Sequence, residues 1–129
     1  MIQAITKETY RTEVKGHKHS MIVDEPVHVG GNDEGMNPHE LLEASLASCS
    51  SITLRMYIQR KNWDVSEINV EVRSILGEER TGLSFAKHIQ LTGNIDEKQK
   101  ERLLFIAGRC PIHRLLAKNM TIGSTIEIV

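Results

Sequence analysis

The feature that most constrains the fold is the stretch from Asn37 to Lys61, which has the pattern of one long helix. Pro38 suits the first helical position, because its missing N–H would have no partner there, and Asn37 before it is a good N-cap. Glu40 stands three residues after the cap, as a capping box requires, and places negative charge in the first turn. Apolar residues recur on more than one face, so the pattern predicts a helix that is buried on most sides.

A cysteine, Cys49, lies near the middle of this helix, in a segment from Ala44 to Ser51 where every residue except Leu46 is small. Small side chains allow another backbone to come close to the sulfur. At ~1.5 Å per residue the whole helix would span roughly 36 Å, about the diameter of a domain of this size. We therefore expect the helix to run through the centre of the fold or to lie between two subunits.

The other segments predict strands and two further helices. Alternating apolar and polar residues are typical of half-buried strands, which are expected at 2–15, 19–23, 65–76, 83–92 and 121–129, with 27–29 as a candidate for a further short one. The strands 65–76 and 83–92 would form a long hairpin across a charged connection, Gly77–Gly82. Helices are expected at 97–109 after the N-cap Asp96, and at 111–118 after the N-cap Cys110. This order predicts an α+β fold in a single domain over residues 1–129, with antiparallel sheets around a long central helix.

Composition places the chain among ordinary globular proteins. It has 129 residues, of which 40% are apolar and 26% charged, with a formal net charge of −1. Such a balance provides no global field that would draw the chain to nucleic acid or to anionic lipid. No apolar run approaches the ~20 residues that cross a bilayer. The first residues lack the basic and apolar regions of an export signal, so we expect a cytoplasmic protein.

The two cysteines, Cys49 and Cys110, are the residues with the clearest chemical potential. A stable structural disulfide between them is not expected in a reducing compartment. They could be two free thiols that serve as small core residues. Cys110 followed by Pro111 would stand at a helix N-terminus, where backbone N–H groups and the helix dipole favour a thiolate. Cys49, in mid-helix, would need a cation from elsewhere in the fold.

Two motifs carry a family resemblance. The first is Gly35-x-Asn37-Pro38-x-Glu40-Leu41-Leu42 followed by Ala47-x-Cys49, and the second is Cys110-Pro111-Ile112-His113-Arg114. With these motifs the chain resembles the OsmC/Ohr family of thiol peroxidases, and it looks closer to the OsmC-like subgroup than to the organic hydroperoxide reductases. The resemblance covers essentially the whole chain, including the order of strands and helices.

The resemblance implies a fold, an assembly and a reaction. It implies an intertwined homodimer with a site at the subunit interface, in which Cys49 is the peroxidatic thiol and Cys110 the resolving one. Cys49 would reduce an organic hydroperoxide and become a sulfenic acid, and Cys110 would condense with it to a disulfide. An external dithiol reductant, in the family often of the lipoyl type, would restore the pair. No metal, haem or flavin cofactor is implied, because the sulfur carries the redox change.

The chain departs from the family pattern beside the Asn-Pro motif. Where the hydroperoxide reductases have a glutamate after the proline, this chain has His39, and Glu40 follows one place later. Glu40 is therefore included with the two cysteines as a candidate catalytic residue. For the cation that activates the thiol, Arg11, Lys15 and Lys18 are the candidates.

Two other functions stay open at this point. The chain could be a redox-inert protein of the same fold that binds a small apolar ligand, with the cysteines lining the pocket. It could also be a thiol sensor or a structural dimer. A metal site is not expected, because the pair formed by Cys110 and His113 has no second pair of ligands at matching spacing, and His17 and His19 lack carboxylate company.

Overall fold

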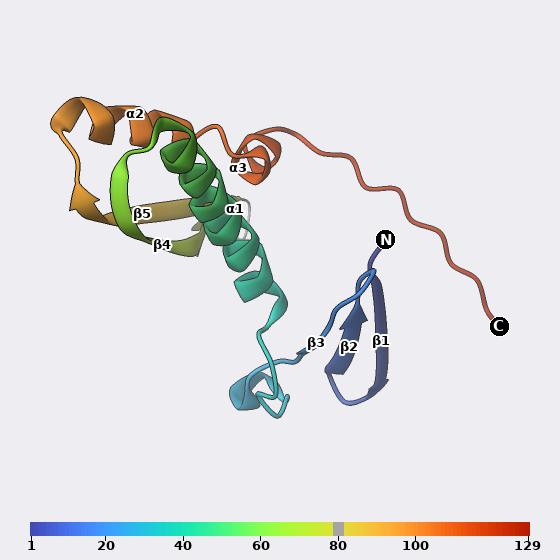
Figure 1. Ribbon diagram of the computed structural model, residues 1–129. Helices are drawn as coiled ribbons and strands as arrows, with labels where there is room; N and C mark the ends of the chain where they lie inside the picture. The colour runs from blue at the N-terminus through green and yellow to red at the C-terminus, as the bar shows by residue number, and fades with distance from the viewer. Residues whose placement is uncertain (79–81) are drawn as a thin grey trace. The chain divides into compact units, whose positions relative to one another are not determined.

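The computed structural model describes residues 1–78 and 82–129, which form two compact units. One unit combines Met1–Ala44 with Ser74–Phe85, and the other combines Ser45–Arg73 with Ala86–Val129. The chain has antiparallel strands and one long helix, so the predicted α+β class is confirmed (Figure 1). Residues 79–81 of the predicted connection Gly77–Gly82 lie outside the described residues.

The first unit contains a three-stranded antiparallel sheet of β1 (Gln3–Glu8), β2 (Arg11–Lys15) and β3 (Ser20–Val23), in that order. The prediction of a single strand over 2–15 is wrong, because the chain reverses at Thr9 and Tyr10. Thr9 adopts a φ of 47°, in the left-handed region. β-branched residues rarely adopt this conformation, so the sequence carried no ordinary turn signal there.

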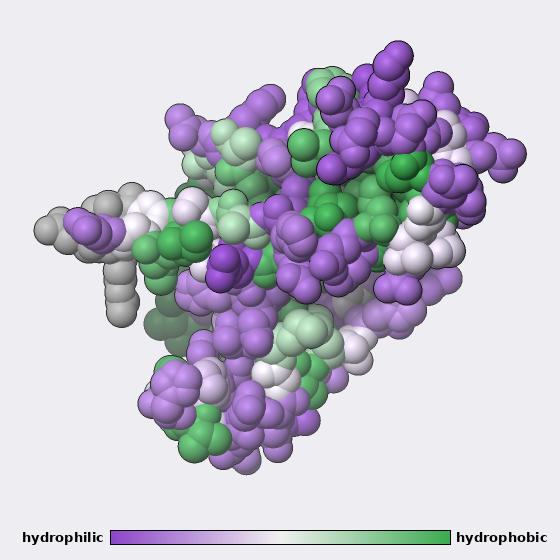
Figure 2. All heavy atoms as spheres, turned by 90° about the vertical axis from the view of Figure 1, so that its left-hand side faces the viewer, coloured by the Kyte–Doolittle hydropathy of each residue, from purple (hydrophilic) through white to green (hydrophobic). Residues whose placement is uncertain are grey.

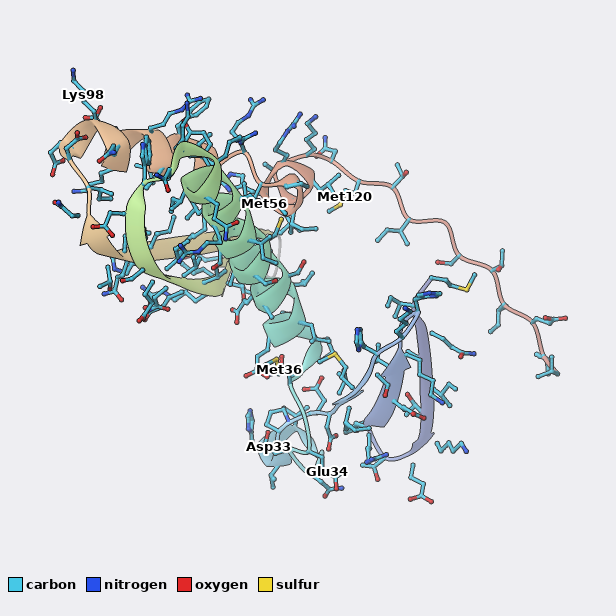
Figure 3. The ribbon with its side chains drawn as sticks, viewed as in Figure 1. Asp33, Glu34, Met36, Met56, Lys98 and Met120 are labelled. Atoms are coloured by element: carbon cyan, nitrogen blue, oxygen red, sulfur yellow. The ribbon has the colours of Figure 1, made fainter. Side chains whose placement is uncertain are left out.

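A single carboxylate organises the loop that follows β3. Asp24 is 2% exposed, and its two oxygens accept hydrogen bonds from the backbone N–H groups of Glu25, Asn32 and Glu34 at 2.8, 3.2 and 3.3 Å. The candidate strand at 27–29 is instead a short 3-10 helix, η1 (Val27–Val29), inside this loop. Figure 3 shows the loop, with Glu34 labelled, leading towards the long helix (Figure 3).

The long helix is α1 (Pro38–Lys61), with the predicted bounds. The predicted capping box is confirmed: Asn37 Oδ1 accepts the N–H of Glu40 at 3.0 Å, and the Glu40 carboxylate accepts the N–H of Asn37 at 2.8 Å. The prediction of burial on most sides is wrong for this chain, since Ile52 is 56% exposed and Met56 is 64% exposed. The described chain covers one face of α1 and leaves exposed the apolar stripe that contains Ile52 and Met56.

The second unit contains the core that holds the C-terminal part of α1. The strands β4 (Asp64–Leu76) and β5 (Leu83–Asn94) pair as the predicted hairpin, and α2 (Glu97–Ala107) follows them. The core side chains come from α1, β4 and α2, and they are Leu54, Tyr57, Ile58, Val65, Leu103 and Ala107. Figure 1 shows these elements gathered around the hairpin.

The last helix of this unit is α3 (Pro111–Leu116), with Cys110 as its N-cap. The prediction of a closing strand at 121–129 is wrong: this segment has no regular secondary structure, and Ile126 in it is 93% exposed. A strand needs a neighbour for its backbone N–H and C=O groups, and the segment pairs with no strand among the described residues.

The surface mixes polar and apolar groups. Figure 2 shows green apolar residues on one face, bordered by purple polar ones (Figure 2). Within residues 1–78 and 82–129, the structure contains no helix that is both long and apolar enough to span a bilayer.

Candidate functional site

Cys110 stands at the centre of a polar cluster in the second unit. Its side chain is fully buried. Because Pro111 occupies the first position of α3, Cys110 becomes the N-cap, and its Sγ accepts the backbone N–H of His113 at 3.3 Å. The sulfur thus takes the place that a serine or aspartate oxygen takes in other helices.

Helix α1 contributes two neighbouring residues to the cluster, Cys49 and Ser50. Ser50 is fully buried, and its Oγ lies 3.5 Å from Cys110 Sγ. Cys49 is partly buried, and its thiol is a hydrogen-bond partner of Cys110. Two thiols that are 61 positions apart in sequence are therefore adjacent in the fold.

A lysine on β5 provides the cation of this cluster. Lys87 Nζ lies 3.0 Å from Ser50 Oγ, 2.8 Å from the carbonyl oxygen of Ala107 and 3.1 Å from His113 Nδ1. Lys87 was not among the site residues predicted from the sequence. The signal was its place in the strand pattern, because Lys87 interrupts an otherwise apolar, alternating set that includes Phe85 and Ile89.

The hydrogen bonds fix a consistent set of protonation states. A lysine ammonium has three N–H donors and no acceptor, and Lys87 has three acceptors around it. His113 Nδ1 accepts from the ammonium, so its imidazole is neutral and carries its proton on Nε2. Ser50 Oγ accepts from Lys87, which leaves its own hydroxyl proton for the sulfur of Cys110.

These surroundings shift the pKa of Cys110 downward. Burial acts to raise the pKa of this thiol, but the hydrogen bonds from Ser50 and from the His113 N–H favour the charged form. The hydrogen bond of the Cys49 thiol and the positive charge of Lys87 act in the same direction, and together these contributions outweigh burial. The cluster therefore stabilises a thiolate on the buried sulfur.

Lys87 and His113 also depart from their ordinary values. Burial lowers the pKa of Lys87, while the charges of Cys110 and then Cys49 act to raise it. Burial lowers the pKa of His113 as well, and the neighbouring charge of Lys87 lowers it further. The positive charge of the cluster thus rests on the lysine and not on the imidazole.

Three of the other candidates from the sequence, Glu40, Arg11 and Lys15, have partners of their own. Glu40 lies in the first unit and caps α1, so its predicted catalytic role stays a prediction. Arg11 and Lys15 lie in β2, where they form ion pairs with Glu34 at 2.7 Å and with Glu13 at 3.1 Å. Across the described part of the chain, no three histidine, cysteine or carboxylate side chains gather as a metal ion would require.

Comparison with protein families shows which family the chain belongs to. Residues 30–125 match the family described as "OsmC-like protein". The chain belongs to the OsmC-like family. Both cysteines and all the partners of Lys87 fall inside the matched residues. Comparison with curated proteins gives no match.

Solved structures of OsmC-like proteins share the fold. An OsmC-like protein from Mycoplasma pneumoniae superposes with a TM-score of 0.78 at 22% identity, over 91% of this chain and 86% of the other. An organic hydroperoxide resistance protein OsmC from Legionella pneumophila gives 0.70 at 18% identity, over 90% and 87%. The organic hydroperoxide resistance protein OhrB of Bacillus subtilis gives 0.62 at 18% identity, over 92% and 90%. At these identities, the comparisons show that the chain has the fold of these proteins.

Proposed function

We propose that this protein is a thiol-dependent peroxidase that reduces organic hydroperoxides through a Cys49 sulfenic acid and a Cys49–Cys110 disulfide. The observation that carries the proposal is the contact between the two thiols beside the ammonium group of Lys87. A cycle through a sulfenic acid and a disulfide requires two adjacent thiols, one of which condenses with the oxidised form of the other.

The two cysteines differ in access, and this difference supports the roles that we propose for them. Cys49 is partly exposed, whereas Cys110 is fully buried, so an incoming peroxide meets Cys49 first. The sulfur of Cys49 attacks one peroxide oxygen, an S–O bond forms, and the O–O bond breaks to release an alcohol. The sulfur of Cys110 then displaces the hydroxyl of the sulfenic acid as water. An external dithiol, for which a lipoyl-type group is our candidate, returns the disulfide to two thiols.

The substrate class rests on the family and its neighbours. Proteins of the same fold include organic hydroperoxide resistance proteins of Legionella pneumophila and Bacillus subtilis. At 18% identity these proteins share the fold with this chain, and the reaction is our proposal for it. A reducing compartment such as the cytoplasm suits a cycle in which the resting state is the dithiol.

The exposed side of α1 supports the further proposal of a homodimer. Cys49, Ile52 and Met56 follow one another at spacings of three and four residues, so they share one helix face. That face exposes Ile52 and Met56 in the single chain, although the stripe is apolar. A second copy that covers this stripe would bury it and would complete the surroundings of Cys49.

A ligand-binding function has weaker support. The first unit has an apolar hollow of ≈ 460 Å³ lined in part by Ile2, Val14 and Met21, and the second unit has one of ≈ 280 Å³ lined in part by Leu54 and Leu103. Binding sites for drug-sized ligands usually measure about 300–1,000 Å³, so the hollow of the first unit falls in that range, but neither cysteine lines it. The thiol cluster, in which one half-buried lysine makes three hydrogen bonds, is the more specialised feature.

Counting thiols during peroxide treatment tests the proposal. The reduced protein is mixed with equimolar cumene hydroperoxide, and free thiols are titrated before and after addition of dihydrolipoamide. We expect both thiols to disappear quickly and to return with the dithiol, over many cycles. Thiols that stay unchanged at equimolar peroxide would overturn the proposal and favour ligand binding. A single oxidation without repeated turnover would favour a thiol sensor.

A further inference from the structure

Three polar groups meet at the sulfur of Cys110. They are the backbone N–H of His113 at 3.3 Å, the hydroxyl of Ser50 at 3.5 Å and the thiol of Cys49. A neutral thiol would use its own proton towards one of these groups, and it accepts hydrogen bonds only weakly. Lys87 donates to Ser50 Oγ, which leaves the hydroxyl proton of Ser50 for the sulfur, and a sulfur that accepts from this hydroxyl, the Cys49 thiol and the N–H together is a thiolate. Lys87, which donates to Ser50 Oγ, provides a positive charge close to the Cys110 sulfur.

Cys49 has the opposite character in this pair. Beside a Cys110 thiolate, which has no proton to donate, the hydrogen bond between the two sulfurs is donated by the thiol of Cys49. The thiolate, and not the thiol, is the nucleophile in sulfur chemistry. Cys49 must therefore lose its proton before it can attack a peroxide, and the hydrogen bond between the two sulfurs provides the path.

We propose that the buried thiolate of Cys110 is the general base that takes the proton of Cys49 when Cys49 attacks the peroxide. This inference rests on the proposed peroxidase function, and it gives Cys110 a role before the disulfide forms. Ser50 and Lys87 are the positioning residues that hold the charge on Cys110 at the start of the reaction.

The steps balance without any further reactant. The Cys49 sulfur forms an S–O bond as the O–O bond breaks, so the sulfur loses two electrons and the peroxide gains them. The proton moves from Cys49 to Cys110, and then from Cys110 to the departing alkoxide, which leaves as alcohol. Cys110 is again a thiolate when it attacks the sulfenic sulfur of Cys49. That step forms the S–S bond and expels hydroxide, which solvent protonates.

The pH dependence of this device involves a small set of groups. Among the described residues, the titratable or charged groups that contact the two sulfurs, directly or through Ser50, are Lys87 of β5 and His113 of α3. His113 is neutral because Lys87 donates to its Nδ1, so the lysine provides the charge that faces the sulfur.

The rate of the first oxidation step tests the proposal. Sulfenic acid formation is followed by stopped flow in a single turnover for the wild type and for Cys110→Ser. If Cys110 acts only in resolution, the two rate constants agree. We expect the variant to be about a hundredfold slower at neutral pH, the typical contribution of a general base. The difference should close at alkaline pH, where thiols ionise unaided. Equal rates at neutral pH would overturn the proposal.

A second measurement does not depend on peroxide. Thiolate absorbance at 240 nm is titrated in Cys49→Ser, in which Cys110 is the remaining cysteine. We expect Cys110 to ionise below the range of ordinary thiols, and we expect Lys87→Met in the same background to move its ionisation upward. Lys98→Met is the matched control, since Lys98 is exposed at the start of α2 and its side chain extends outward from that helix.

The two measurements separate the possible failures. An unshifted Cys110 that does not respond to Lys87→Met overturns the general-base proposal, even if the protein is a peroxidase. A wild-type protein that no hydroperoxide oxidises overturns the proposed function, even if Lys87 controls the ionisation of Cys110.

Discussion

The ammonium nitrogen of Lys87 lies 3.1 Å from Nδ1 of His113. This contact determines which residue carries the positive charge beside the cysteines, because an imidazole that accepts from an ammonium group cannot itself be protonated at Nδ1. In a site that contains a histidine and a cysteine, an imidazolium beside the thiolate is the usual arrangement. Here the histidine is a neutral spacer, and the lysine is the cation.

We predict that His113 is the neutral Nε2–H tautomer at neutral pH. Burial, and then the charge of Lys87, lower its pKa, so protonation should require a pH below the ordinary value of about 6.5. Imidazole 15N chemical shifts recorded against pH check both points. Lys87→Met should raise the pKa of His113, and Lys98→Met should leave it unchanged. An imidazolium at neutral pH would contradict the prediction.

The two cysteine variants should stop the reaction at different points. Cys49→Ser removes the accessible thiol and should abolish turnover. Cys110→Ser should still react with peroxide once, at its reduced rate, and should stop at a sulfenic acid, because no second thiol can condense with it. Mass spectrometry after dimedone treatment detects that adduct on Cys49. Mild and similar losses of activity in both variants would indicate that the cysteines are packing residues.

The starts of the helices that carry the two cysteines could be predicted from the sequence, because helix-capping signals are local. The Asn37 cap and the Pro38 start of α1 depend on neighbours within one turn, and so does the N-cap at Cys110. Lys87 was not predicted as a site residue because its place in the apolar set of β5 does not show which polar groups of other elements it meets. Its three partners lie 20 to 37 positions away in sequence, so no local rule connects them to it.

The errors in the fold have equally physical causes. The turn at Thr9 uses a left-handed φ that a β-branched residue rarely adopts, so the sequence pattern predicted one continuous strand. The segment Thr121–Val129 has a strand-like sequence, but a strand forms only where another strand can receive its hydrogen bonds. Propensity alone therefore could not decide either case.

We predict that Asp24→Asn loosens the loop between β3 and α1. An amide nitrogen in place of one oxygen would face backbone N–H groups of Asn32 and Glu34, or of Glu25, with a donor. Burial acts to raise the pKa of Asp24, but these hydrogen bonds, together with the charge of Arg11, lower it below the ordinary value. The carboxylate therefore stabilises the loop above about pH 3.9, and this contribution is lost as the pH falls through the lower folded-state pKa.

Amide hydrogen exchange of the loop measures this effect. Protection of the N–H groups of Asn32 and Glu34 should fall in Asp24→Asn at neutral pH, while protection in α2 stays at the wild-type level. In the wild type the same amides should lose protection on acidification. Wild-type protection in the variant would contradict the role given to Asp24.

Gly93 in β5 should not tolerate a larger residue. A Cβ built on Gly93 would lie 2.1 Å from the carbonyl oxygen of Asp64, and this contact is with backbone that cannot rotate away. Overpacking of this kind costs about 1–3 kcal/mol, so Gly93→Ala should lower the free energy of unfolding by that amount. Urea denaturation checks the value. Gly123→Ala is the matched control, because a Cβ there meets nothing within 4 Å.

The exposed stripe of α1 gives the last prediction, which concerns assembly. If a second copy covers Ile52 and Met56, then Met56→Glu would bury an unpaired carboxylate in the interface, which is costly. We expect this variant to be monomeric at concentrations where the wild type is dimeric, as measured by light scattering during size exclusion. Met56 is 64% exposed in the single chain, so its replacement should leave the fold intact. Leu104→Glu, at a 70% exposed position of α2, is the matched control and should leave the dimer unchanged.

A wild type that is monomeric, or a Met56→Glu variant that is as dimeric as the wild type, would contradict an interface on this face. If the interface holds, the partner subunit covers the face that carries Cys49, and the monomeric variant should then react more slowly with peroxide while the ionisation of Cys110 is retained.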